Sequence, residues 1–79
     1  MIENQNEIID DNLYETIIDC NIKRVSSRLA QITVMYENGV KERIWTFNYS
    51  RYNFDYIDFI GMTKIEAIFY CDRKKPTQI

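Results

Sequence analysis

The chain has 79 residues, which is room for one small domain. Its apolar fraction of 46% and charged fraction of 28% are typical of a globular protein and exclude an intrinsically disordered one. Histidine is absent, so the commonest general base and the commonest metal ligand are both missing.

Charge is distributed unevenly along the chain. Residues 1–22 contain six acidic side chains and no basic one, whereas residues 23–79 contain all ten Lys and Arg against six acids. We expect residues 1–12 to form an acidic, flexible segment, 13–75 a single domain and 76–79 a tail. The acidic stretch is interpreted either as a solvated lead-in or as a face for a basic partner. In the second case its candidate partner-binding residues are Asp10, Asp11, Glu15 and Asp19.

The first expected element is a strand over residues 13–22, where the β-branched run Thr16–Ile18 favours an extended backbone. A strand would place on one face Tyr14, Thr16, Ile18, Cys20 and Ile22. A helix is the alternative, because a stripe at helical spacing and a capping box from Asn12 to Glu15 are both present. That stripe consists of Ile9, Leu13, Ile17 and Cys20. We favour the strand.

The clearest local signal is Asn38-Gly39, the pair preferred in a two-residue type I′ turn. Strand-like runs flank it at 30–37 and 40–49, so the sequence predicts an antiparallel hairpin. Counting outward from the turn pairs Val34 with Arg43, Ile32 with Trp45 and Ala30 with Phe47. One face then carries Ala30, Ile32, Val34, Tyr36, Trp45, Phe47 and Tyr49, and the other carries Gln31, Thr33, Met35, Glu42, Ile44 and Thr46.

Residues 50–60 contain no Gly or Pro and show no convincing helical stripe. We expect an ordered connection that Phe59 and Ile60 anchor to the core. Its first part has the composition of an interface patch, because Tyr and Arg carry much of the binding energy in protein interfaces. The candidate partner-binding residues are Arg51, Tyr52, Asn53, Phe54, Asp55 and Tyr56. The alternative is a loop that only closes over the sheet.

A helix over about residues 63–75 is expected next, because Thr63 and Glu66 form a capping box and Pro76 ends the pattern. Positive charge at Arg73–Lys75 complements the helix macrodipole. The expected core-facing stripe is Met62, Ile65, Ile68 and Phe69. The predicted fold class is therefore α+β: a small antiparallel β-meander of two or three strands packed against this one C-terminal helix.

The sequence predicts no enzyme, no cofactor and no metal. Cys20 and Cys71 are outside any CxxC pair and are interpreted as reduced thiols, with a disulfide between them as the alternative. Gly39 and Gly61 are accounted for by the turn and the helix entry, so no phosphate-binding loop is present. Asp55 and Asp58 are expected to be solvated rather than catalytic.

A cytoplasmic location and no membrane partner are expected. Residues 1–6 lack the basic and apolar regions of a secretory signal, and no apolar run approaches the roughly 20 residues that cross a bilayer. Because so short a chain buries a limited core, a homodimer is one way in which it could gain stability.

Two functions follow from these features. The first is a non-catalytic inhibitor or adaptor that binds a basic, nucleic-acid-binding protein. The second is a small single-stranded nucleic-acid- or nucleotide-binding module using residues 45–59, where seven of fifteen side chains are aromatic. Net charge of −2 and the acidic residues 1–22 disfavour the second, because phosphate binding needs a positive field.

Four features of the whole chain carry a resemblance at the level of a class. They are its length, the acidic stretch from Glu3 to Asp19, the aromatic connection from Tyr49 to Tyr56 and the lack of a catalytic site. In these the chain resembles small phage and mobile-element proteins that block host defences, anti-CRISPR inhibitors among them. The resemblance implies occlusion of a nucleic-acid-binding effector in the host-cell cytoplasm, and it assigns no binding residue.

Overall fold

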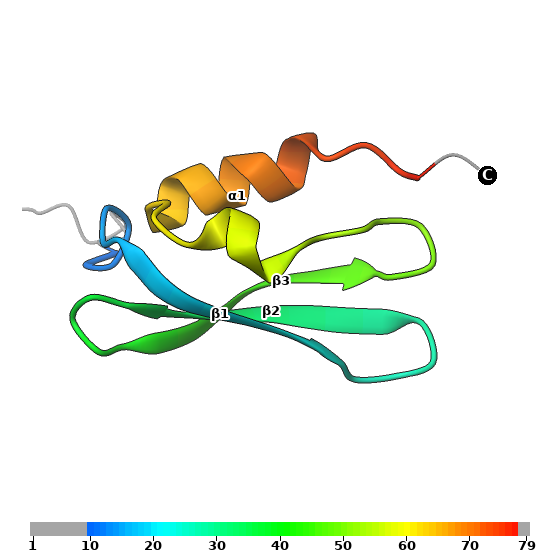
Figure 1. Cartoon of the computed structure of the whole chain (residues 1–79), viewed down its shortest axis with the longest axis horizontal. Helices are drawn as coiled ribbons and strands as arrows, with labels where there is room; N and C mark the ends of the chain where they lie inside the picture. The colour runs from blue at the N-terminus through cyan, green and yellow to red at the C-terminus, as the bar shows by residue number, and fades with distance from the viewer. Residues whose placement is uncertain (1–9, 78–79) are drawn as a thin grey trace, which may run out of the picture.

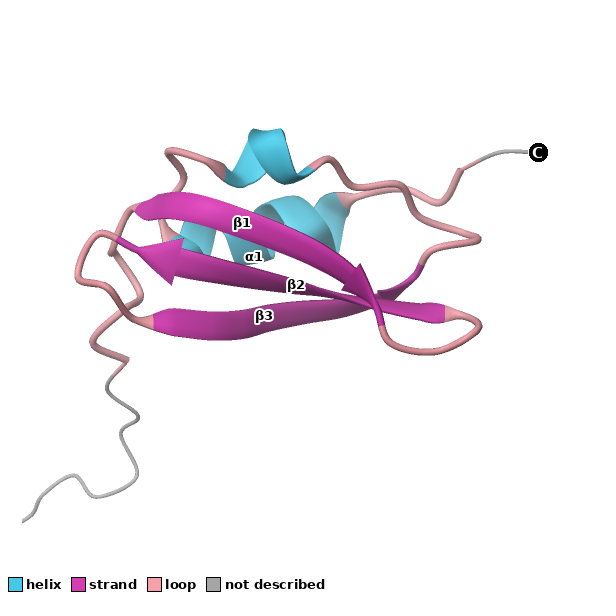
Figure 2. Ribbon diagram, turned by 60° about the horizontal axis from the view of Figure 1, so that its bottom comes forward, coloured by secondary structure: helices cyan, strands magenta, loops and turns pink. Residues whose placement is uncertain are grey.

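The computed structural model describes residues 10–77. Its elements follow the order β1 (Ile17–Arg24), β2 (Leu29–Tyr36), β3 (Lys41–Asn48), the 3₁₀ helix η1 (Tyr56–Phe59) and α1 (Lys64–Arg73). The strands form one antiparallel sheet in which β2 lies between β1 and β3. Both helices lie on the same face of this sheet (Figures 1 and 2). The predicted α+β class, with a three-stranded meander and a C-terminal helix, is confirmed.

The first element is the predicted strand and not the alternative helix, but it contains an irregularity. Ile17 pairs with Tyr36 and Asp19 pairs with Met35, so Ile18 is an extra residue in β1. A bulge of this kind reverses the alternation of side chains beyond it. Ile17 and Cys20 are therefore both buried, while Ile18 is 46% exposed. The prediction that Ile18 shares the face of Cys20 was wrong for this reason.

The hairpin has the predicted pairs Ala30–Phe47 and Ile32–Trp45, but its turn differs from the prediction. Tyr36 N–H donates to Val40 O at 2.9 Å, and Gly39 N–H donates to Tyr36 O at 2.9 Å. Among the described residues, positive φ occurs only at glycine, +87° at Gly39, so Asn38 does not adopt the type I′ conformation. The loop thus has three residues, 37–39, and the predicted two-residue turn was wrong.

The extra loop residue shifts the pairing next to the turn by one position. Val34 pairs with Glu42 and not with Arg43, and the shift between Ile32 and Thr33 leaves Ile44 as the extra residue of β3. Residues paired across an antiparallel sheet lie on the same face. Glu42 therefore lies on the face that the helices cover, where the uninterrupted register had placed Arg43 instead.

The core lies between the sheet and the segment 54–71. Phe54 packs edge-on against Phe47 with ring centroids 4.7 Å apart, and Phe59 packs against Tyr70 at 5.4 Å. The buried apolar residues are Ile17, Cys20, Ala30, Ile32, Val34, Tyr36, Phe47, Phe54, Phe59, Ala67 and Cys71. We expected Phe59 and Ile60 to anchor the connection, but Ile60 is 40% exposed. Phe54 and Phe59 are the buried residues that anchor it.

Helix α1 begins as predicted: Thr63 is the N-cap and forms the capping box with Glu66. It ends at Arg73 with Lys74 as C-cap, two residues before the predicted end. Its buried residues are Lys64, Ala67 and Cys71, whereas Phe69 of the predicted stripe is 50% exposed. The helix is rotated because Phe54 and Phe59 already fill much of the volume above the sheet, so the helix turns small side chains, Ala67 and Cys71, into the core beside them.

Replacing Phe59 by Ala should lower the free energy of unfolding by about 3–5 kcal/mol, because its fully buried ring would leave a cavity. The matched control is Phe69→Ala, where half of the side chain is already exposed, and its cost should stay below about 1 kcal/mol. Urea denaturation followed by circular dichroism measures both. Equal losses in the two variants would contradict this description of the core.

Candidate functional site

The aromatic segment predicted to bind a partner is divided between the core and the surface. Phe54 is buried and Tyr52 is half-buried against the core, so Phe54 is not available to a partner. Asn53 and Asp55 are exposed, and Tyr56 is 54% exposed. The predicted patch is thus reduced on this side to residues 53, 55 and 56.

Arg51 makes its contacts with a different part of the chain from residues 53, 55 and 56. Its side chain is exposed, and its carbonyl oxygen accepts a hydrogen bond from Thr77 N–H at 2.6 Å. Arg51 belongs to the turn at residues 49–51, which follows β3, whereas Tyr56 begins η1, which contacts β1.

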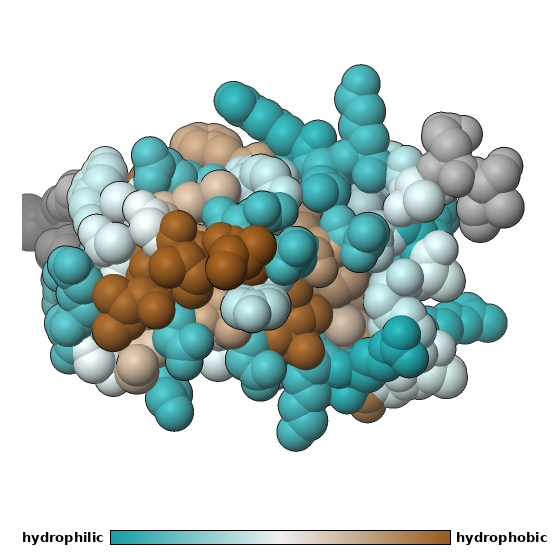
Figure 3. Space-filling model, viewed as in Figure 1, coloured by the Kyte–Doolittle hydropathy of each residue, from teal (hydrophilic) through white to brown (hydrophobic). Residues whose placement is uncertain are grey.

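An apolar surface that the sequence did not indicate lies beside Tyr56. Ile57 and Ile60, on either side of Phe59 in the chain, are 58% and 40% exposed. Gly61 N–H donates to Ile17 O at 2.9 Å, which holds Ile60 close to the bulge residue Ile18. Figure 3 shows strongly hydrophobic side chains gathered over η1 and the beginning of β1. We name this surface the η1 ridge; its apolar members are Ile18, Tyr56, Ile57 and Ile60.

Two aspartates lie in the same short helix as the apolar residues of the ridge. Asp55 is the N-cap of η1, and its Oδ1 accepts the N–H of Ile57 at 3.2 Å. Asp58 is exposed, and its Oδ2 accepts a hydrogen bond from the Tyr70 hydroxyl at 2.9 Å. The ridge is therefore an apolar surface with acidic neighbours. The signal that could have revealed it is the spacing of Ile57 and Ile60, three residues apart and out of phase with buried Phe59.

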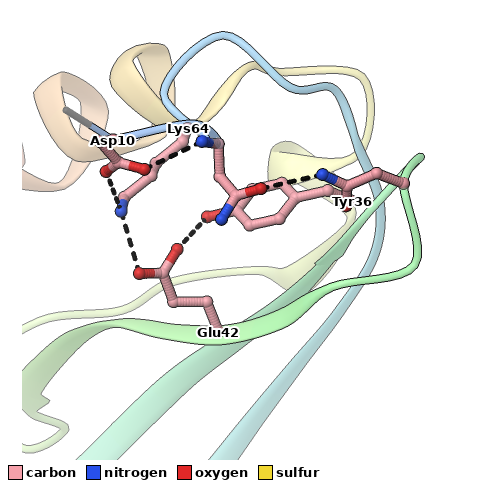
Figure 4. A network of polar contacts seen from close by, with 6 residues as sticks. Asp10, Tyr36, Glu42 and Lys64 are labelled. Atoms are coloured by element: carbon pink, nitrogen blue, oxygen red, sulfur yellow. Dashed lines mark hydrogen bonds and ion pairs between the residues drawn. The ribbon is translucent and has the colours of Figure 1, made fainter.

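The acidic segment contributes less free charge than its sequence suggests, because Asp10 is bound to Lys64. Lys64 Nζ lies 2.5 Å from Asp10 Oδ2 and 3.0 Å from Glu42 Oε2 (Figure 4). Glu42 Oε1 accepts a hydrogen bond from the Tyr36 hydroxyl at 2.7 Å. This network joins residue 10, β2, β3 and α1, so its role is structural.

The charges in this network support one another. Burial by itself lowers the pKa of Lys64, but hydrogen bonds to Asp10 and Glu42 outweigh it and raise that pKa above 10.5. The hydrogen bond from Lys64 lowers the pKa of Asp10 below 3.8. Burial raises the pKa of Tyr36, and its hydrogen bond to Glu42 adds to the effect. Lys64 is thus a buried, charged lysine with two carboxylate partners.

The three other predicted acids differ in exposure. Asp11 is exposed and Glu15 is half-buried. Asp19 is exposed on β1, and its Oδ1 accepts the N–H of Cys20 at 2.9 Å. Residues 1–9, the remainder of the predicted flexible segment 1–12, lie outside the described residues, while Asp10 to Asn12 contact the domain.

The groove beside the ridge is lined mostly by polar residues and by one buried thiol. It has a volume of about 460 Å³ and is lined by Cys20, Asn21, Ile22 and the segment 53–56. Cys20 and Cys71 are free and buried, and burial raises the pKa of these thiols to about 11 and about 12. Within residues 10–77, no three His, Cys, Asp or Glu side chains are grouped as metal ligands would be.

No protein-family model, curated protein or solved structure matches this chain. Within the described part of the chain, no helix combines the length and hydropathy that spanning a bilayer requires.

The buried thiols should not react with a disulfide reagent such as DTNB in the folded protein at neutral pH. Only the thiolate attacks the reagent, and the raised pKa of both thiols keeps them neutral. Both should react in denaturant, which is the internal control. Rapid modification of the native protein would show that one thiol is accessible and ionised.

The Asp10–Lys64 contact should make stability depend on pH in acid. Because folding lowers the pKa of Asp10, its contribution is present above the ordinary value of 3.8 and is lost as the pH falls below it. Asp10→Asn should therefore be less stable than the wild type at neutral pH, with a difference that shrinks in acid. Urea denaturation across this pH range measures the difference. Asp11→Asn is the control, since it removes a neighbouring exposed charge and keeps the contact to Lys64.

Proposed function

We propose that this chain is a non-catalytic protein-binding domain, an inhibitor or adaptor, that engages a basic protein through the η1 ridge. The observation that carries the proposal is the exposure of Ile18, Tyr56, Ile57 and Ile60 in one place beside Asp55 and Asp58. Exposed apolar surface with a polar rim is typical of protein interaction sites.

The ridge is presented on an ordered backbone, which favours binding. Asp55 caps η1, Ile60 N–H donates to Ile57 O at 3.3 Å, and Gly61 N–H ties the end of the helix to β1. Association loses less entropy when the binding residues are already held in place. The side chains of the ridge are thus already in place before a partner binds, and no segment has to fold on binding.

Acidic neighbours specify the charge of the partner. Asp55 and Asp58 flank Ile57 along the chain. Such a rim attracts a positively charged surface and accelerates its association. Nucleic-acid-binding proteins carry such surfaces, so an effector of a host defence system, as the resemblance to anti-CRISPR proteins implies, is the partner class in this proposal.

Nucleic-acid binding by the aromatic residues 45–59 has weaker support. Stacking needs an exposed ring face, yet Phe47, Phe54 and Phe59 are buried. Trp45, Tyr49 and Tyr52 pack partly buried against the core, and Arg24 covers the Tyr49 ring at 4.2 Å. Tyr56 alone of the seven is largely exposed.

The proposal is tested with the partner recovered by chemical cross-linking in the native host. Ile57→Ala and Ile60→Ala should each weaken its binding to the purified protein at least about tenfold, because central apolar contacts dominate interface energies. Val25→Ala is the matched control, an aliphatic residue 47% exposed that follows the far end of β1. Isothermal calorimetry gives the three affinities.

Asp55→Asn, which retains a capping side chain, should slow association and reduce its dependence on salt. Unchanged affinity in both isoleucine variants would place the interface elsewhere on the molecule.

A further inference from the structure

The outer edge of β1 is partly free to pair with another strand. β1 is an edge strand of the sheet, and within residues 10–77 backbone hydrogen bonds reach its outer edge only at its beginning. There Ile17 N–H donates to Met62 O at 2.7 Å and Gly61 N–H donates to Ile17 O at 2.9 Å. From Ile18 to Arg24 the described residues place no further strand along this edge. Unpaired backbone groups of this kind are a template for another chain.

The orientation of these backbone groups follows from one hydrogen bond. Cys20 N–H donates to Oδ1 of its neighbour Asp19 at 2.9 Å and not to β2, so it is directed outward. An added strand has to replace this one hydrogen bond with its own carbonyl oxygen, which frees the Asp19 carboxylate. Because backbone groups alternate in direction along a strand, those of Ile22 and Arg24 are directed outward as well. An added antiparallel strand must therefore present its own outward groups to Cys20, Ile22 and Arg24.

A second copy of β1 meets this requirement when the twofold axis passes through Asn21. Cys20 then lies opposite Ile22 of the second copy, and both residues have outward groups. In the same register Asp19 lies opposite Lys23 of the second copy, and Lys23 opposite Asp19, so two cross-strand ion pairs form. Directly opposite charges of unlike sign stabilise an antiparallel pair.

The neighbouring registers lose this complementarity. Moving the axis to Cys20 places Asp19 opposite Asn21, and moving it to Ile22 places Asp19 opposite Val25. An axis at Lys23 brings the two lysines face to face. The charges of β1 therefore distinguish one antiparallel register from the others that backbone hydrogen bonding permits.

We propose that the protein forms a twofold-symmetric dimer through antiparallel pairing of its β1 edges about Asn21, so that two three-stranded sheets join into one. The occupant of the edge is thus a second copy of this chain. Twofold symmetry requires a self-complementary surface, and the Asp19–Lys23 spacing supplies it.

The length of the free edge matches the partner strand. In the proposed register Ile18 lies opposite Arg24 of the second copy, where β1 ends. The position beyond it, beside Ile17, is occupied by Gly61 and Met62 of the same chain. Each strand therefore ends where the free edge of the other copy ends.

The groove of about 460 Å³ lies beside this edge and is lined by Cys20, Ile22 and residues 53–56. It can receive the side chain of Ile22 of the second copy. The other edge strand, β3, is less suitable, because its bulge at Ile44 interrupts the edge in the middle.

This dimer goes beyond the proposed function and does not depend on it. A continuous sheet with the axis through Asn21 keeps the helices of both copies on one side. The two proposals are tested with different variants, at Ile57 and Ile60 for the partner and at Asp19 and Lys23 for the dimer. Failure of the dimer leaves the partner-binding test unaffected, and the reverse also holds.

Sedimentation equilibrium of the full chain over a range of concentrations tests the proposal. The wild type should show a monomer–dimer equilibrium. Asp19→Lys and Lys23→Asp should each weaken it about tenfold or more, since attraction at two symmetric sites becomes repulsion. The double variant D19K/K23D should restore dimer formation. Arg43→Asp, a charge reversal at an exposed position of β3, is the matched control and should dimerise as the wild type does.

A cross-link tests the register independently of charge. Residues opposite each other in a pair without mutual hydrogen bonds have Cβ atoms about 4.5–5.5 Å apart, and Asn21 lies opposite itself in such a pair. Asn21→Cys should form an intermolecular disulfide under mild oxidation, whereas Lys23→Cys should not. The wild type, whose two cysteines are buried, is the control.

Three outcomes would overturn the proposal: a wild type that stays monomeric at every concentration, a dimer that is insensitive to both single reversals, or cross-linking at position 23 in place of 21. Circular dichroism confirms that each variant is folded. If a charge variant does not fold, the cross-linking result at position 21 decides by itself.

Discussion

At Ile44 the third strand contains one residue more than its neighbour, and the shift turns Glu42 toward the helices. There Glu42 and Asp10 meet the ammonium group of Lys64 in the first turn of α1. A buried lysine needs such partners, since an unpaired charge away from water is strongly destabilising. The bulge therefore determines how α1 is seated on the sheet and how residue 10 is attached to the domain.

The seating of α1 determines which side chains form the core. Lys64, Ala67 and Cys71 are its buried residues, and the side chains at 67 and 71 are small. Phe54 and Phe59 from the connection supply the buried rings, and Tyr70 of the helix packs partly buried against both. Because the connection is anchored by these two rings, Ile57 and Ile60 lie on its outer side. The exposed ridge is thus a consequence of how the core is filled.

A second bulge shapes the opposite edge of the sheet. The extra residue Ile18 turns Ile17 and Cys20 inward together and leaves itself exposed beside η1. Beyond it β1 is regular, with Asp19 and Lys23 on the uncovered face of the sheet. The two proposed interfaces therefore share one origin: the bulge adds an apolar residue to the ridge and starts the regular stretch of free edge.

Local signals in the sequence determined the fold class, the hairpin about Asn38-Gly39 and the start of α1 at Thr63, because turn and capping preferences act between residues close in the chain. They did not determine the bulges at Ile18 and Ile44, since the alternation of a strand does not show where an extra residue is accommodated. The inward position of Phe54 and the exposure of Phe69, Ile57 and Ile60 were decided by competition for one small volume above the sheet. Only the tertiary structure resolves that competition, because it depends on residues far apart in the chain filling the same space.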